Sequence, residues 1–138
     1  MTKLHMALLE FWSSFEWQGE KIPAFPVGRV PENQPFPYIT FEVIQGGFFG
    51  VSLPTTYVWC KQPSDGSYNV QAQRADILDQ IAKAIPESGK MVRFDGGMVR
   101  LERNDTNFLS YYDEPNTDNT TEPVIGGRVS VSAHSYIY

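Results

Sequence analysis

The chain has 138 residues, of which 41% are hydrophobic and 20% charged, as expected for one globular domain. Its net charge of -5 and its lack of a basic run argue against a dedicated nucleic-acid-binding protein, because such proteins pair Lys and Arg with phosphates. A single cysteine, Cys60, excludes an intramolecular disulfide and suits a reducing cytoplasm, and no segment predicts a signal peptide or a membrane span.

The N-terminal region predicts a helix and then a proline-rich crossing. Apolar side chains at helical spacing indicate a helix over residues 2–17, with Thr2 as its N-cap and Gly19 at its end. Residues 20–37 contain too many prolines for regular structure. The apolar residues within this crossing predict that it is pinned to the fold: Phe25, Val27 and Val30.

Two strands are expected next. Residues 37–45 alternate apolar and polar side chains after a stiff Pro-Phe-Pro lead-in, and residues 46–50 form a glycine-framed turn that presents Phe48 and Phe49. The second strand spans residues 51–62, with Pro54 at an edge or a bulge. Its alternation places Thr56, Val58 and Cys60 on one face and Tyr57, Trp59 and Lys61 on the other.

The clearest element is an amphipathic helix over residues 68–85, capped by Ser67 and stopped by Pro86. Its apolar stripe consists of Val70, Ile77, Leu78, Ile81 and Ile85. Its solvent side is expected to carry Gln73, Arg74, Asp76, Asp79, Gln80 and Lys83, with an ion pair between Asp79 and Lys83.

The C-terminal part predicts a hairpin, a short strand, a loop and a long strand. Residues 90–94 and 98–103 flank the Asp95-Gly96-Gly97 turn, and residues 108–112 add a short strand. Residues 113–123 are acidic and turn-rich, which indicates a mobile loop before a closing strand over residues 124–138. The alternation of this strand places one set of residues on the same face: Val129, Val131, Ala133, Ser135 and Ile137. The predicted fold is a single α+β domain (residues 1–138) with two helices on one face of a mostly antiparallel sheet, in the order α-β-β-α-β-β-(β)-β.

No residue pattern predicts catalysis, a cofactor or a metal. Cys60 and His134 could form a nucleophile–base pair, and Asp76 and Asp79 could pair as carboxylates, but no local signature surrounds either pair. His5 shares no ligand spacing with His134, and the loop carboxylates lack the spacing of a calcium loop. The glycine pairs 46–47, 96–97 and 126–127 lack a phosphate-loop context and are interpreted as turns or bulges.

The order of these elements, from the N-terminal helix through PFPYITFEV (residues 35–43) to the C-terminal strand, resembles the tail terminator (tail-completion) proteins of long-tailed bacteriophages. The resemblance implies a structural virion protein that forms a hexameric ring, ends polymerisation of the tail tube and provides the surface for head–tail joining. It implies three partners: further copies of the chain, the major tail tube protein and a head-completion protein. The genome would pass through without specific binding, which an acidic bore favours, and the protein would be assembled in the host cytoplasm.

The expected interface residues lie in the glycine-framed turn, the second strand and the acidic loop: Phe48, Phe49, Trp59, Asp113, Glu114, Asp118 and Glu122. Two alternatives remain open at this point. The first is a head–tail connector or minor capsid protein, and the second is a small ligand-binding module, for instance for a carbohydrate, that uses Trp59, Tyr136 and Tyr138.

Overall fold

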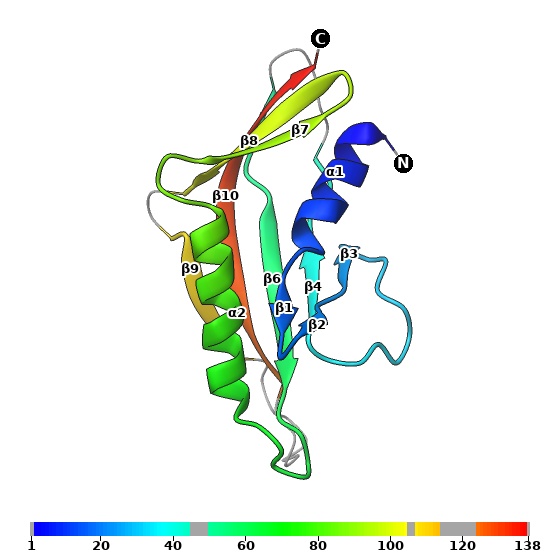
Figure 1. Cartoon of the computed structure of the whole chain (residues 1–138), viewed down its shortest axis with the longest axis vertical. Helices are drawn as coiled ribbons and strands as arrows, with labels where there is room; N and C mark the ends of the chain where they lie inside the picture. The colour runs from blue at the N-terminus through cyan, green and yellow to red at the C-terminus, as the bar shows by residue number, and fades with distance from the viewer. Residues whose placement is uncertain (1, 45–49, 105–106, 114–123, 138) are drawn as a thin grey trace.

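The structure, a computed structural model, describes residues 2–44, 50–104, 107–113 and 124–137. These residues form a curled, mostly antiparallel sheet with two helices on its inner face (Figure 1), so the predicted α+β class is confirmed. The main strand path is β3 (Ala24–Pro26), β4 (Tyr38–Phe41), β6 (Thr55–Lys61), β10 (Val124–Ile137), β8 (Gly97–Arg103) and β7 (Lys90–Phe94).

Strand β10 organises the sheet, because its 14 residues pair along both sides. Its first half lies between β6 and β9 (Leu109–Asp113), and its second half lies between β8 and β5 (Gly50–Ser52). The predicted strand over residues 51–62 is therefore two strands, β5 and β6. Pro54 stands at the break between them, where its missing backbone N–H interrupts no hydrogen bond between strands. Its carbonyl accepts a hydrogen bond from Val131 N.

The inner face of the sheet holds the core. Buried and half-buried residues alternate along β6 and β10, which confirms the predicted faces of both strands. Gly127 of β10 allows helix α2 (Val70–Ala84) to pack closely, because a Cβ atom at this position would lie only 2.6 Å from Leu78 Cδ1. The prediction that Gly126 and Gly127 form a turn or bulge is therefore wrong, whereas Asp95-Gly96 does turn the β7–β8 hairpin.

Helix α2 spans Val70–Ala84, so it starts two residues later and ends one residue earlier than predicted. Its N-cap is Asn69, whose side chain accepts hydrogen bonds from Gln71 N and Ala72 N, so the prediction of Ser67 as cap is wrong. The predicted apolar stripe is buried and Asp79 pairs with Lys83 at 3.0 Å. At the other end, Arg103 of β8 donates to the carbonyls of Ala82 and Ile85, both at 2.7 Å, and so satisfies the last turn.

Two residues of α2 that the sequence assigns to solvent are buried. Gln73 is 1% exposed and Arg74 is 7% exposed. The curled sheet covers more of the helix than its apolar stripe, so polar neighbours of the stripe are enclosed too. Arg74 compensates by donating from Nη1 to Gly126 O at 3.3 Å and by stacking over the ring of Tyr111 at 4.3 Å.

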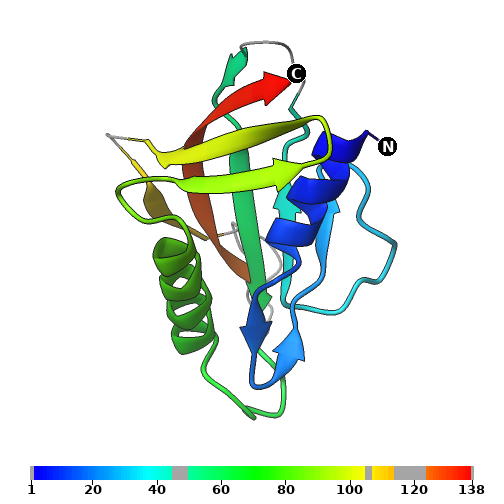
Figure 2. The ribbon, with the colours of Figure 1, turned by 45° about the horizontal axis from the view of Figure 1, so that its top comes forward.

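The first helix, α1 (Lys3–Trp12), has the predicted Thr2 cap but ends five residues early. Residues 16–21 instead form a small hairpin of β1 (Glu16–Trp17) and β2 (Glu20–Lys21), turned by Gln18 and Gly19 with positive φ. Helix α1 contacts β7, β8 and β3 (Figure 2). Neither α1 nor α2 has the length and apolar character that crossing a bilayer requires.

The proline-rich crossing is pinned to the sheet, as predicted, but Val27 contributes only its backbone N–H, because its side chain is 54% exposed. The crossing is also more regular than predicted. β3 pairs with β4 in parallel, and Ile39 N donates to the carbonyl of Pro23. A cis peptide bond joins Phe36 to Pro37 just before β4. Strand β3 of the crossing thereby forms one edge of the sheet.

Candidate interaction surface on the outer face of the sheet

The outer face of β4 and β6 carries aromatic side chains. In the antiparallel register Tyr38 lies opposite Trp59 and Thr40 lies opposite Tyr57, which places all four on the same face. The rings of Tyr57 and Trp59 stack with centroids 5.5 Å apart and planes at 23°. Trp59 Nε1 donates a hydrogen bond to Thr40 Oγ1 at 3.1 Å, which fixes the orientation of the indole.

Two further rings extend this surface from the proline-rich crossing. Phe25 of β3 lies 6.3 Å from Tyr38, and Phe36 lies 5.1 Å from Tyr38, as centroid distances. The aromatic face therefore comprises five half-buried rings: Phe25, Phe36, Tyr38, Tyr57 and Trp59.

Gly126 of β10 lets the backbone of β6 approach closely beneath the centre of this face. It lies opposite Trp59 in the register, and a Cβ atom there would stand 2.7 Å from Val58 O and 3.5 Å from Trp59 Cε3. Both helices pack on the other face of the sheet (Figure 1). Within the described residues, no helix covers the aromatic face.

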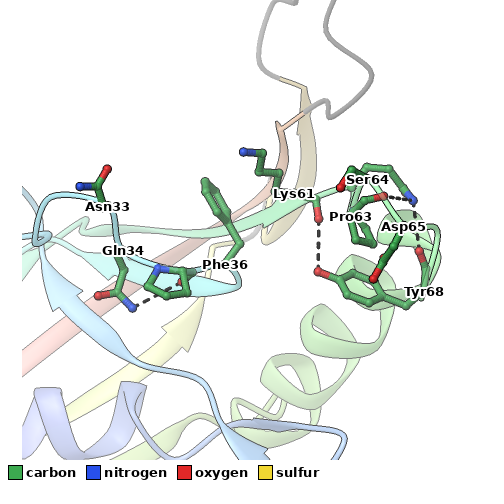
Figure 3. A pocket seen from close by; sticks show the side chains of 10 residues that line it. Asn33, Gln34, Phe36, Lys61, Pro63, Ser64, Asp65 and Tyr68 are labelled. Atoms are coloured by element: carbon green, nitrogen blue, oxygen red, sulfur yellow. Dashed lines mark hydrogen bonds between the residues drawn. The ribbon is translucent and has the colours of Figure 1, made fainter.

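An open hollow of about 580 Å³ adjoins the aromatic face (Figure 3). Figure 3 shows Asn33 and Gln34 at one end of it and Asp65 and Tyr68 at the other, with Phe36 and Lys61 between them. Lys61 Nζ lies 6.0 Å from the centroid of the Phe36 ring. The hollow is wide and shallow, so it suits a protruding chain segment better than an enclosed small molecule.

The far wall of the hollow is held by hydrogen bonds within the fold. Gln62 Oε1 accepts from Val70 N at 3.2 Å, and Tyr68 Oη donates to Lys61 O at 3.3 Å. The backbone N–H of Ser67 holds the pKa of the exposed Asp65 carboxyl below its usual value, so Asp65 stays charged near neutral pH. The wall is therefore preorganised and carries one fixed negative charge.

Of the predicted interface residues, Trp59 lies at the centre of the aromatic face. Asp113 ends β9. The remaining ones fall outside the described residues: Phe48, Phe49, Glu114, Asp118 and Glu122. Of the ring candidates for a ligand module, Tyr136 is half-buried on β10, and Tyr138 is outside the described residues.

The side chains considered for catalysis are not brought together. Cys60 is on the inner face, where burial raises its thiol pKa to about 12, whereas His134 is on the outer face 3.5 Å from Glu102. His5 Nε2 lies 2.7 Å from Ile44 O. Asp76 and Asp79 are exposed on α2, and no group of three or more metal-ligating side chains occurs among the described residues.

The chain matches no family model, no curated protein and no solved structure at a significant level.

Sequence reasoning missed four members of the aromatic face: Phe25, Phe36, Tyr38 and Tyr57. A signal for two of them was present, since the alternation in residues 55–61 puts Tyr57 beside Trp59 and that in residues 38–41 puts Tyr38 on the face opposite Phe41. Phe25 joins only through the parallel β3–β4 pairing, and Phe36 joins from the cis Phe36–Pro37 segment just before β4; the proline-rich sequence holds no local pattern for either.

Proposed function

We propose that this chain is a structural subunit of a bacteriophage tail, a tail terminator that forms a ring on the tail tube, ends tube polymerisation and presents a surface for head–tail joining. The element order through residues 35–43 motivates the choice of class. The observation that carries the proposal is the aromatic face, a group of half-buried rings on and beside the strands β4 and β6 that no helix covers among the described residues.

Such a face fits the recognition of another protein. Aromatic side chains are enriched at the centres of protein interfaces, because they bury a large area and lose little conformational entropy. The stacked Tyr57–Trp59 pair and the Trp59–Thr40 hydrogen bond hold the rings in place before any partner arrives. Preorganised contacts of this kind increase affinity, because less ordering accompanies binding.

The experiment is to remove the chain from a phage that encodes it and to image the tails by negative stain. Tails of uncontrolled length support termination. Tails of normal length that lack heads favour the alternative, a head–tail connector or neck protein. Absence of the chain from purified virions overturns both.

A matched pair of variants tests the role of the aromatic face. Trp59→Ala is expected to abolish length control while the circular dichroism spectrum is retained. The control, Tyr136→Ala, removes an aromatic side chain from the other end of the outer face and is expected to keep length control. Equal length control in the two variants would refute the assignment of the aromatic face.

The half-buried aromatic rings also favour the ligand-module alternative, because the flat face of an aromatic side chain can stack on a sugar. A glycan array probed with the wild-type chain and with Trp59→Ala separates the two classes. Binding of a defined glycan that is lost in Trp59→Ala would favour the ligand module.

A further inference from the structure

A tight turn projects from the margin of the sheet that lies away from α2 and β9 (Figures 1 and 2). Arg29 N donates to Pro26 O at 3.0 Å, and Gly28 has φ +83°, which are the features of a type II turn. Val27 N is held by Phe41 O at 2.9 Å. The turn is therefore preformed and anchored to β4.

The tip of this turn is apolar and free of contacts on its outer side. Val27 is 54% exposed, and a Cβ atom placed on Gly28 would meet nothing within 4 Å. Arg29 supplies an exposed positive charge next to Val27. We refer to Val27, Gly28 and Arg29 as the projecting turn.

An apolar groove of about 320 Å³ lies on the opposite side of the molecule, between α2 and β9. It is lined mainly by Ala75, Leu78, Asp79, Ala82, Leu109 and Tyr111. The two alanines leave room above the sheet, and Asp79 places a carboxylate at the rim. We refer to this feature as the α2–β9 groove.

The groove is open on the side that faces away from β10. Among the described residues β9 pairs only with β10, so its other edge offers free backbone donors and acceptors. Tyr111 is 68% exposed, and its ring is held by the guanidinium of Arg74 at 4.3 Å. The exposed Tyr111 ring, held in one orientation, can therefore pack against a side chain that enters the groove.

We infer that the projecting turn of one copy inserts into the α2–β9 groove of a second copy. The turn is apolar with a positive flank, and the groove is apolar with a negative rim, so Val27 would enter the groove while Arg29 reaches Asp79. Asp79 already holds Lys83 at 3.0 Å, but both side chains are exposed and free to rearrange. Because the two features lie on opposite sides of the chain, the contact is head-to-tail and can repeat around a ring.

This inference deepens the proposed ring and rests on it, but its direct test does not require tails. Two double variants are compared under oxidising conditions at high protein concentration: Val27→Cys with Ala82→Cys, and Val51→Cys with Ala82→Cys. Val51 is also exposed but belongs to β5, outside both features. Cys60 is buried in both proteins and does not compete.

The first double variant is expected to form a ladder of cross-linked species on a non-reducing gel, because a disulfide requires Cα atoms within about 7 Å. The second is expected to remain monomeric or to cross-link far less. Equal cross-linking in the two variants, or none in either, overturns the inference.

A charge exchange provides a second readout. Arg29→Glu and Asp79→Arg, each in the background of the first double variant, are expected to lower the ladder yield about tenfold by placing like charges together. Combining the two exchanges is expected to recover most of the yield. Failure of the combination to recover it would remove the Arg29–Asp79 contact from the inference.

The tail experiment distinguishes the two proposals. A clear ladder from a chain whose removal leaves tails unchanged refutes the proposed function and keeps the contact. Loss of length control on removal of the chain, with no ladder in the first double variant, refutes the contact and keeps the function.

Discussion

Gln73 of α2 is enclosed in the core with 1% of its surface exposed, and neither its Nε2 nor its Oε1 has a hydrogen-bond partner among the described residues. A buried amide without partners loses its hydration and regains nothing, at a cost of about 1–3 kcal/mol. Gln73→Met keeps the length and helix propensity of the side chain while removing both polar atoms. The free energy of unfolding is therefore expected to rise by about 1–2 kcal/mol.

The assay is urea unfolding followed by circular dichroism, with wild type and variant compared at equal m-value. A gain of this size corresponds to an increase of roughly 3–8 °C in melting temperature for a chain of this length. The matched control is Gln71→Met, an exposed position on the same helix, where a change within about 0.5 kcal/mol is expected.

Either of two results would refute this reasoning. If Gln73→Met lowers the free energy of unfolding by more than about 1 kcal/mol at unchanged m-value, the amide is satisfied in solution, for example by a buried water. If Gln71→Met gains as much as Gln73→Met, the effect comes from methionine itself and not from removing a buried amide.

Three further predictions concern the same fold. Asn69→Ala is expected to lose about 1 kcal/mol in urea unfolding because it removes the α2 cap, whereas Ser67→Ala stays within about 0.5 kcal/mol; equal losses would contradict the cap assignment. Arg103→Met should lower the free energy of unfolding by about 2–4 kcal/mol and Arg103→Lys by about half as much, because lysine keeps the charge but cannot donate to both carbonyls at once. An unchanged free energy of unfolding in Arg103→Met would show that these two hydrogen bonds add no stability. The pKa of Cys60 is raised to about 12 in the fold against 9.0 for the free thiol, so the thiol of the unfolded chain deprotonates first as pH rises. The free energy of unfolding should therefore fall by about 1 kcal/mol per pH unit between pH 9 and pH 12, and Cys60→Ala should remove this part of the slope. Parallel pH profiles of urea midpoints for wild type and Cys60→Ala would refute it.

Elements that depend on local pattern were predictable from the sequence. The alternation in β6 and β10, the Asp95-Gly96 turn and the apolar stripe of α2 are confirmed, because each is dictated by neighbours within a few residues. The same alternation correctly put Trp59 and Tyr57 on the face opposite Cys60.

Elements that depend on distant pairing were not predictable in this way. One miss is local: the helical spacing continues to Phe15, but α1 ends at Trp12 and residues 16–17 pair with residues 20–21 in a hairpin. Gln73 is polar in sequence, yet the curl of the sheet encloses it. Phe25 reaches the aromatic face only through the parallel β3–β4 pairing, whose partners are 15 residues apart (Ala24 with Ile39).

The aromatic face and the α2–β9 groove use different elements of one rigid sheet, and the projecting turn, although it follows Phe25 of the aromatic face, exposes a separate side chain, Val27, so the two contacts are separable by mutation. The aromatic face comes from the outer side of β4 and β6 with the crossing, whereas the α2–β9 groove opens beside β9 on the inner side. β10 pairs with both β6 and β9, so the spacing between the two surfaces is set by backbone hydrogen bonds and not by loops. The proposed function, which would require contact with a tube and with a neighbouring copy at once, needs such a fixed spacing. Val27→Asp, which adds a charge to the projecting turn, should therefore weaken self-association while leaving the aromatic face intact. Trp59→Ala should disrupt the aromatic face while leaving self-association unchanged.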